Sequence, residues 1–279
     1  MNSSTFIGIT TFVYLFVMVM YFCYLFFRNK KLGIIIKVTT IIGFLANTAG
    51  WAIRWVESYQ MGHGYIPLSN MYEALISLSW CTVLMLLVIE RKYKTDTLGV
   101  FVFPIVSIAM AYASLSPNVQ QEIQPLIPAL QSNWLTYHVL TCFLGYAAFA
   151  VSCGSSIAFL IKNRKGSDSS AKEPGLLPTI DLLDEIIYKS NAVGFMLLGV
   201  GIITGAVWAN YAWGSYWSWD PKETWSLITW FIYAIFLHAR ITRGWRGNKT
   251  AILSIIGFCA VIFTFLGVNY VLSGLHSYA

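Results

Sequence analysis

The chain has 279 residues, of which 57% are hydrophobic and only 11% charged, and its mean hydropathy is +0.64. Soluble domains carry about 25% charged residues, so this composition excludes a soluble globular domain, a secreted disulfide scaffold and a disordered chain. It predicts an all-α, polytopic membrane protein.

Eight hydrophobic segments have lengths near the roughly 20 residues that a helix needs to cross a bilayer. We treat residues 1–279 as a single integral membrane domain. Its predicted spans are residues 6–27, 32–54, 71–90, 97–115, 134–161, 192–211, 226–241 and 250–273.

The basic residues predict the orientation of these spans. If the spans alternate in direction, all of the 18 Lys and Arg residues except Arg54 and Lys222 fall on one side of the membrane. Basic residues accumulate on the cytoplasmic side, so both termini are expected on the extracytoplasmic side. The net charge of +6 then follows from topology, and a lipid bilayer rather than a nucleic acid is the indicated partner.

The cytoplasmic loop 162–191 contains an amphipathic segment, with Ile180, Leu183, Ile186 and Ile187 at helical spacing. We expect this segment to lie along the inner membrane surface; docking of a partner is the alternative. The five cysteines all fall within predicted spans and form no C-x-x-C motif, which indicates buried apolar residues rather than a disulfide or a redox site.

Six of the eleven tryptophans lie between residues 208 and 230, most of them in the extracytoplasmic loop 208–225. An aromatic belt at the membrane interface is the simpler interpretation. However, a belt needs only one or two rings at each helix end, and here the rings crowd around Gly214, which leaves room for a flat surface. We therefore predict that the loop binds a large planar ligand. The residues predicted to bind it are Trp208, Trp213, Gly214, Tyr216, Trp217, Trp219, Asp220, Lys222 and Trp225.

Part of this loop has a structural explanation. Asp220, Pro221 and Glu223 form the pattern of a capping box that starts the seventh span. Lys222 either binds the carboxylates of an amphiphilic ligand or pairs with Asp220 or Glu223. A second pattern of this kind, Asn70 with Glu73, predicts the start of the third span.

The histidines suggest what the planar ligand contains. His138, one helical turn from Trp134, and His276 are expected at the membrane depth of the tryptophans. Imidazole suits iron, so these two side chains could take both axial positions of a haem. His63 is also outside but has no aromatic cluster beside it, and we rank it third. His238 lies within a span, where an ionisable residue is a functional candidate.

The run Trp-Gly-x-Tyr-Trp-x-Trp-Asp-Pro-Lys-Glu-Thr-Trp within residues 208–230 resembles the "WWD" signature of the haem-handling protein superfamily. The segments 242–247, 263–269 and 273–278 are similar to System II cytochrome c biogenesis proteins of the CcsA/ResC type. The resemblance covers most of the chain and is strongest from residue 190 onwards.

This resemblance implies a fold, a reaction and partners. The WWD loop would hold non-covalent haem b in transit at the outer face, His138 and His276 would be the axial ligands, and His238 would serve a haem site in the membrane. The chain would be one subunit of a cytochrome c synthase (haem lyase), working with a CcsB/ResB-type membrane partner on apocytochrome c. No catalytic residue is separable from haem binding.

The membrane implied by the resemblance is a bacterial plasma membrane or a thylakoid. Two other roles remain open on the sequence. The protein could be a haem exporter or chaperone without ligation activity, or a non-catalytic regulator or scaffold, as are some superfamily relatives that affect haem synthesis rather than cytochrome assembly.

Overall fold

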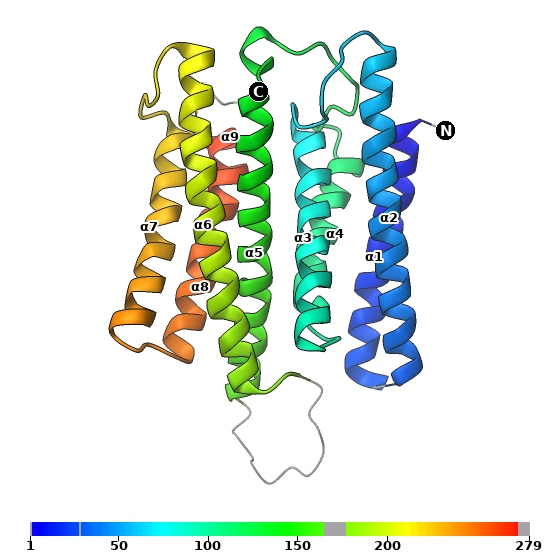
Figure 1. Cartoon of the computed structure of the whole chain (residues 1–279). Coiled ribbons are helices and arrows are strands. Elements are labelled where there is room, and N and C mark those ends of the chain that lie inside the picture. The colour runs from blue at the N-terminus through cyan, green and yellow to red at the C-terminus, as the bar shows by residue number, and fades with distance from the viewer. Residues whose placement is uncertain (1, 28, 165–176, 273–279) are drawn as a thin grey trace. The chain divides into compact units, whose positions relative to one another are not determined.

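The computed structural model describes residues 2–27, 29–164 and 177–272, and within them it contains helices and no strands (Figure 1). This confirms the all-α class. The elements are α1 (Ser3–Phe27), α2 (Lys30–Gln60), α3 (Met71–Tyr93), α4 (Gly99–Leu115), η1 (Pro128–Leu130), α5 (Asn133–Arg164), α6 (Ile180–Trp213), α7 (Pro221–Thr242), α8 (Asn248–Ile262), the π-helical turn η2 (Phe263–Gly267) and α9 (Val268–Val271).

Seven helical segments in the described residues are long and apolar enough to cross a membrane, the last being the continuous run Asn248–Val271. The remaining predicted span, residues 97–115, corresponds to the apolar helix α4, which has 17 residues. The chain is therefore a polytopic membrane protein, as predicted.

The amphipathic segment that we expected on the membrane surface is instead the first part of α6. Thr179 caps this helix by accepting a hydrogen bond from the Leu182 N–H. No glycine or proline interrupts the sequence between Ile180 and Ala192, so the helix continues without a break for 34 residues. At 1.5 Å per residue this is about 51 Å, well beyond the hydrocarbon core of a bilayer.

The single domain expected from the sequence divides into two compact units, Met1–Ile127 and Pro128–Ala279. In the first unit, α1 packs against α2 and α4, and α3 packs against α4 and α2. Tyr14 and Tyr21 of α1 contact the ring of Phe103 in α4, with centroid distances of 5.7 and 5.3 Å.

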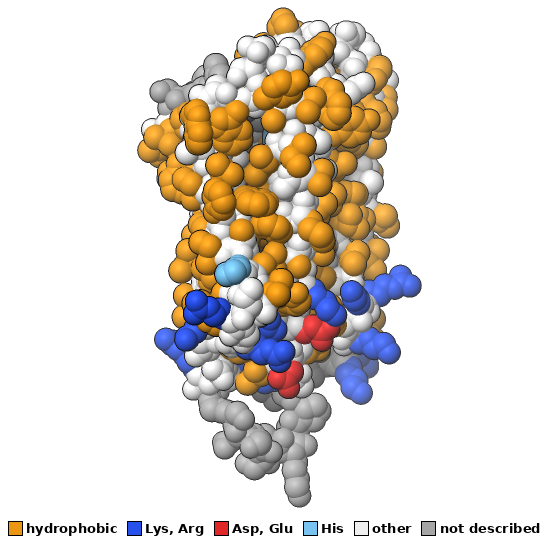
Figure 2. Space-filling model, turned by 60° about the vertical axis from the view of Figure 1, so that its left-hand side comes forward, with side chains coloured by type: hydrophobic (Ala, Val, Ile, Leu, Met, Phe, Trp, Pro, Cys, Tyr) orange, Lys and Arg blue, Asp and Glu red, His pale blue; other side chains and the backbone are white. Residues whose placement is uncertain are grey.

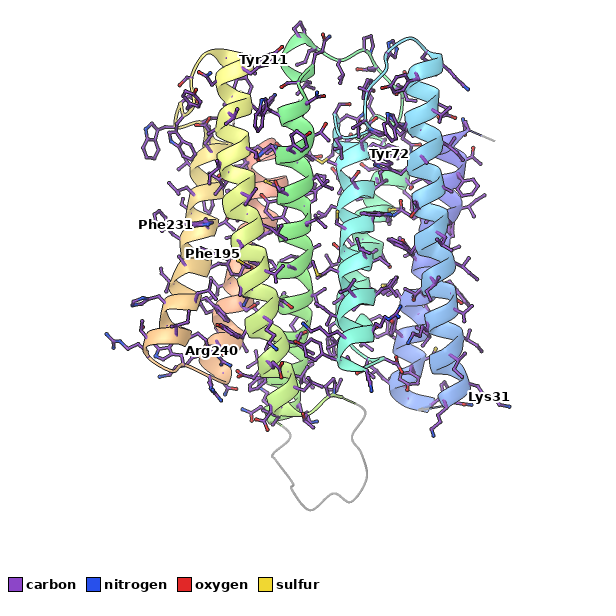
Figure 3. The ribbon with its side chains drawn as sticks, in the orientation of Figure 1. Lys31, Tyr72, Phe195, Tyr211, Phe231 and Arg240 are labelled. Atoms are coloured by element: carbon purple, nitrogen blue, oxygen red, sulfur yellow. The ribbon has the colours of Figure 1, made fainter. Side chains whose placement is uncertain are left out.

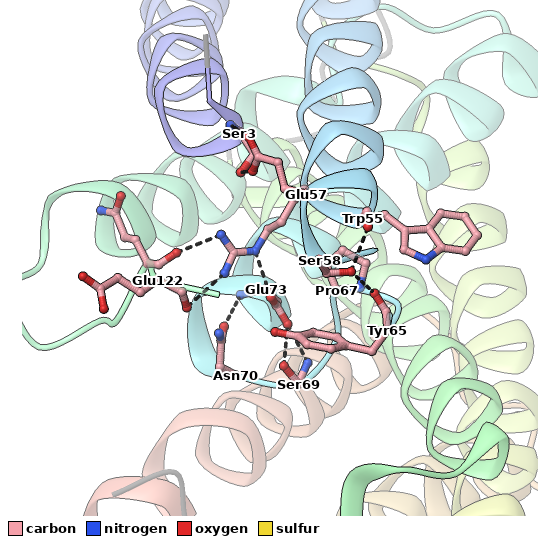
Figure 4. Close-up of polar contacts among 12 residues, drawn as sticks. Ser3, Trp55, Glu57, Ser58, Tyr65, Pro67, Ser69, Asn70, Glu73 and Glu122 are labelled. Atoms are coloured by element: carbon pink, nitrogen blue, oxygen red, sulfur yellow. Dashed lines mark hydrogen bonds and ion pairs between the residues drawn. The ribbon is translucent and has the colours of Figure 1, made fainter. Parts of the chain in front are cut away.

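An ion pair is buried within this first unit. The Nε of Arg54 in α2 donates to Oε1 of Glu73 in α3 at 2.8 Å, and the two side chains are 1% and 0% exposed (Figure 4). The Arg54 guanidinium also donates to the backbone carbonyls of Gln121 and Glu122. Arg54 thus joins α2, the start of α3 and the segment that follows α4.

The predicted capping box at α3 is present only in part. The Asn70 side chain accepts from the Glu73 N–H at 2.8 Å, as predicted. The Glu73 carboxylate, however, accepts from the N–H and hydroxyl of Ser69 rather than from the Asn70 N–H, and its other oxygen binds Arg54. Its side chain therefore serves the ion pair as well as the helix start.

In the second unit, α5 packs along α6 and also against α8, while α7 lies against α6 and α8. Glycines permit the close approach of α5 and α6. A Cβ added at Gly145 would lie 3.2 Å from the backbone of Gly194 and Leu198. Further along, the rings of Phe149 in α5 and Tyr233 in α7 stack at 3.5 Å.

A second ion pair holds the basic end of this unit. Arg240 in α7 binds Asp184 in the α6 extension, and Arg240 also donates to the carbonyl of Trp245. Asp184 further accepts from the Gly247 N–H at 3.2 Å. Arg240 and Tyr211 are labelled near opposite ends of this unit in Figure 3, and Figure 2 shows Lys and Arg side chains gathered at one end of the face beside α7.

Candidate functional site

The tryptophan-rich segment contains a seven-residue loop between two helices. α6 ends at Trp213 because Gly214 adopts a left-handed conformation, with φ of 75°. α7 begins at Pro221, so the loop covers residues 214–220 rather than 208–225. Trp208 and Trp213 lie on α6, and Trp225 lies on α7.

The predicted capping box at the start of α7 is confirmed. The Asp220 carboxylate accepts from the Lys222 N–H at 3.0 Å, and Glu223 accepts from the Asp220 N–H at 3.2 Å. Glu223 also accepts from the Ser218 N–H at 2.8 Å, which fixes the middle of the loop to the helix. Both carboxylates therefore set the conformation of the loop that carries the tryptophans.

The loop presents its aromatic rings toward the surroundings. Tyr216 is 58% exposed and Trp219 is 69% exposed, while the ring of Trp217 lies perpendicular to that of Trp219 at 5.7 Å. Trp219 has φ of 59°, a conformation that is rare for a bulky residue and costs about 1–3 kcal/mol. Such strain is found at binding sites.

His138 lies on α5 and faces α6. Its Nδ1 is 2.7 Å from the carbonyl oxygen of Gly201, and its ring is parallel to that of Trp208 at 6.0 Å and 13°. Since a carbonyl can only accept, Nδ1 carries the proton and the lone pair of the neutral ring is on Nε2. Nε2 has no hydrogen-bond partner among the described residues, so it remains available to a metal.

Trp208 lies parallel to the His138 ring and is too buried to stack on a planar ligand. It is 3% exposed, its indole N–H donates to the Ala129 carbonyl at 2.9 Å, and it contacts the ring of Trp213 at 4.8 Å. Trp134, which we expected on the face of His138, is 42% exposed and contacts Tyr137. The sequence predicted that Trp208 and His138 lie at the same membrane depth. It did not predict that the Trp208 ring is buried against the histidine.

Lys222 lies beneath the loop and reaches an asparagine. Its Nζ donates to Oδ1 of Asn269 at 2.9 Å, and Asn269 is buried in the last turn of the α8–α9 run. The π-helical turn Phe263–Gly267 ends two residues before Asn269, and such turns are frequent at functional sites. In the sequence, Asn269 stands out as an amide side chain within an apolar span. It entered the sequence analysis only as part of the family segment 263–269. Trp225 contacts Phe263 of the same turn at 4.2 Å.

No other histidine in the described part of the second unit joins this cluster. His276 lies outside the described residues. His63 belongs to the first unit, where its N–H donates to the Ser58 carbonyl at 2.9 Å. His238 is exposed on α7 and lines a shallow groove with Ala234, Ile235, Ala239, Arg243 and Trp245.

The side chains at this site fit a metal ion whose equatorial ligands are supplied by a bound organic ring rather than by the protein. Among residues 2–27, 29–164 and 177–272, no three His, Cys, Asp or Glu side chains form a group that could hold a bare metal ion. A single imidazole beside exposed aromatic rings is the arrangement that suits an iron porphyrin, whose ring supplies four nitrogens and whose iron takes an axial histidine.

Comparisons with known proteins agree with the motif. Three relatives are each described as "Cytochrome c biogenesis protein CcsA". The protein from Chlamydomonas reinhardtii is 44% identical over 81% of this chain and 63% of its own length. The protein from Microcystis aeruginosa is 42% identical over 81% of each chain, and the one from Pyropia yezoensis is 40% identical over 87% of each. This chain thus spans less than two thirds of the Chlamydomonas protein.

A solved structure, "Cytochrome c Heme Lyase CcmF", matches 95% of this chain and 47% of its own, with a TM-score of 0.70 and 16% identity. At that identity the likeness shows the fold alone. The sequence model described as "Cytochrome C assembly protein" matches residues 68–276, which include α3 to α9 and the tryptophan loop. The chain therefore belongs to the cytochrome c assembly protein family.

Proposed function

We propose that this protein binds haem at the extracytoplasmic end of its second unit and presents it for attachment to apocytochrome c. The observation that carries the proposal is the orientation of His138, whose Nε2 is available while Nδ1 is held by a backbone carbonyl. Outer-sphere hydrogen bonds of this kind orient metal-binding histidines and raise their basicity. His276 would supply the second axial ligand.

The chain's own residues would orient the haem. His138 would bind the iron, and the loop rings of Tyr216, Trp217 and Trp219 would cover the porphyrin face. Lys222 would place positive charge near the haem carboxylates. Attachment adds each of the two Cys-x-x-Cys-His thiols across one vinyl group of ferrous haem. A carbon–sulfur bond forms, the thiol hydrogen moves to the other vinyl carbon, and no net oxidation takes place.

We propose that this reaction requires a CcsB/ResB-type partner, and that the protein acts in a bacterial plasma membrane or a thylakoid. Its cyanobacterial and algal relatives support either membrane. A haem carrier without ligation activity is distinguished by its product. A synthase gives cytochrome with covalent haem that survives a denaturing gel when both subunits are present, whereas a carrier binds haem and gives none.

Replacing both Trp217 and Trp219 with leucine is expected to reduce haem occupancy about tenfold, because an aromatic stack contributes about 0.5–1.5 kcal/mol for each pair beyond its buried area. Haem is measured by pyridine haemochrome assay on protein purified with its partner. Trp55→Leu, which changes a partly exposed tryptophan in the first unit, is the matched control. Equal occupancy in the loop variant and the control would contradict stacking on the loop.

A further inference from the structure

The imidazole of His138 packs against three residues of α6. The Gly201 carbonyl binds Nδ1, Trp208 lies parallel to the ring, and Gly205 faces its edge. A Cβ at Gly205 would lie 2.6 Å from Nδ1 and 2.7 Å from Cε1. Both distances are too short for any side chain, so the ring can occupy this position only because residue 205 is glycine.

The acceptor of the His138 bond is itself fixed in place. The Gly201 carbonyl also accepts from Oγ1 of Thr204 at 3.1 Å. Gly201 lies so close to α5 that a Cβ there would come within 2.5 Å of the Cys142 sulfur and 3.3 Å of the Cys142 backbone nitrogen. The spacing of the two helices therefore sets the distance between the carbonyl and the imidazole.

The third contact of His138, the ring of Trp208, is held by a residue outside α5 and α6. The indole N–H of Trp208 donates to the carbonyl of Ala129 in η1, and the ring is 3% exposed. Trp208 cannot turn away from His138 without losing this bond. The turn Pro128–Leu130, which lies shortly before α5 and is 79 residues from Trp208 at Ala129, thus contributes to holding the histidine.

We infer that Gly205 and Trp208 are positioning residues that orient His138 so that Nε2, and not Nδ1, binds the haem iron. This inference rests on the proposed function, which it deepens. It gives Trp208 a different part from the loop tryptophans: it acts on the ligand through His138, while Trp217 and Trp219 contact the porphyrin.

Gly205→Ala, made in the full chain with its partner, tests the inference against a matched control. Gly194→Ala overpacks the same face of α6, since a Cβ there would lie 2.5 Å from the Phe149 ring. Residue 194 is 11 positions away, about 16 Å along the helix. Both variants should lose comparable thermal stability, but only Gly205→Ala should disturb His138.

Two readouts are measured for each protein. One is the haem affinity and the low-spin bis-imidazole electron paramagnetic resonance signal of the oxidised complex. The other is the 15N chemical shift of Nδ1 in haem-free, histidine-labelled protein, assigned with His138→Gln. We expect Gly205→Ala to lose the protonated Nδ1 signal and to bind haem about 10- to 100-fold more weakly, the usual cost of losing an outer-sphere contact to a metal-binding histidine. Gly194→Ala should keep the wild-type signal and affinity.

Trp208→Phe covers the case in which Gly205→Ala does not fold. Phenylalanine retains a ring beneath His138 but cannot donate to Ala129, so haem affinity should fall while Trp134→Phe, which changes an exposed tryptophan, has no effect. The inference would be overturned by equal haem loss in the Gly205 and Gly194 variants, or by an unchanged Nδ1 signal in Gly205→Ala. If the wild-type protein binds no haem but Gly205→Ala alone loses the protonated Nδ1 signal, the proposed function would be contradicted and the role of Gly205 in orienting His138 would still be supported.

Discussion

His138→Ala is expected to reduce the yield of holocytochrome c by at least about tenfold in cells that express both subunits and an apocytochrome substrate. Under the proposed function, the change takes away the imidazole that would hold the iron in its presenting position. The covalent cytochrome is measured by haem staining of denaturing gels, with the level of membrane-inserted protein measured alongside.

His63→Ala is the control for this prediction. His63 lies in the first unit and carries no aromatic cluster, so its removal should leave the yield within about twofold of wild type. An equal loss in both variants, or no loss in His138→Ala, would contradict the assignment of His138 as a ligand.

Arg54→Ala is expected to lower the free energy of unfolding by about 3–5 kcal/mol. The change leaves the fully buried Glu73 carboxylate without its cation, and the carbonyls of Gln121 and Glu122 lose their donor. Reversible unfolding in mixed detergent and sodium dodecyl sulfate measures the difference.

Lys37→Ala provides the contrast, because Lys37 and Asp96 form an exposed pair at 3.8 Å with side chains 53% and 56% exposed. Such pairs contribute at most about 1 kcal/mol. If Arg54→Ala destabilised the protein no more than Lys37→Ala does, the buried network would have no structural importance.

Local sequence signals predicted most of the fold. The apolar runs predicted each membrane helix, and Asp220, Pro221 and Glu223 predicted the residue at which α7 begins. The errors arose where a helix continued past the apolar run. Residues 180–191 are amphipathic, which is compatible both with a surface helix and with an extension of α6. The contact between Asp184 and Arg240, which joins residues far apart in sequence, explains how the extension is held.

The candidate site was predictable by residue type but not by geometry. The density of tryptophans and the position of His138 indicated a planar ligand and an iron-binding imidazole. The role of Trp208 depends on the register between α5 and α6, which places Gly201 and Gly205 beside His138, and that register cannot be read from one helix alone. Likewise, the sequence offered Asp220, Glu223 or a ligand as partners for Lys222, whereas the chain also supplies Asn269.

The most direct test of haem binding at the outer site is the absorption spectrum of the purified protein and its partner, compared among wild type, His138→Ala and His276→Ala. We expect a reduced bis-histidine haem spectrum in the wild type that is lost or altered in each variant. A colourless wild-type protein, or a spectrum unchanged by both substitutions, would contradict haem binding by His138 and His276.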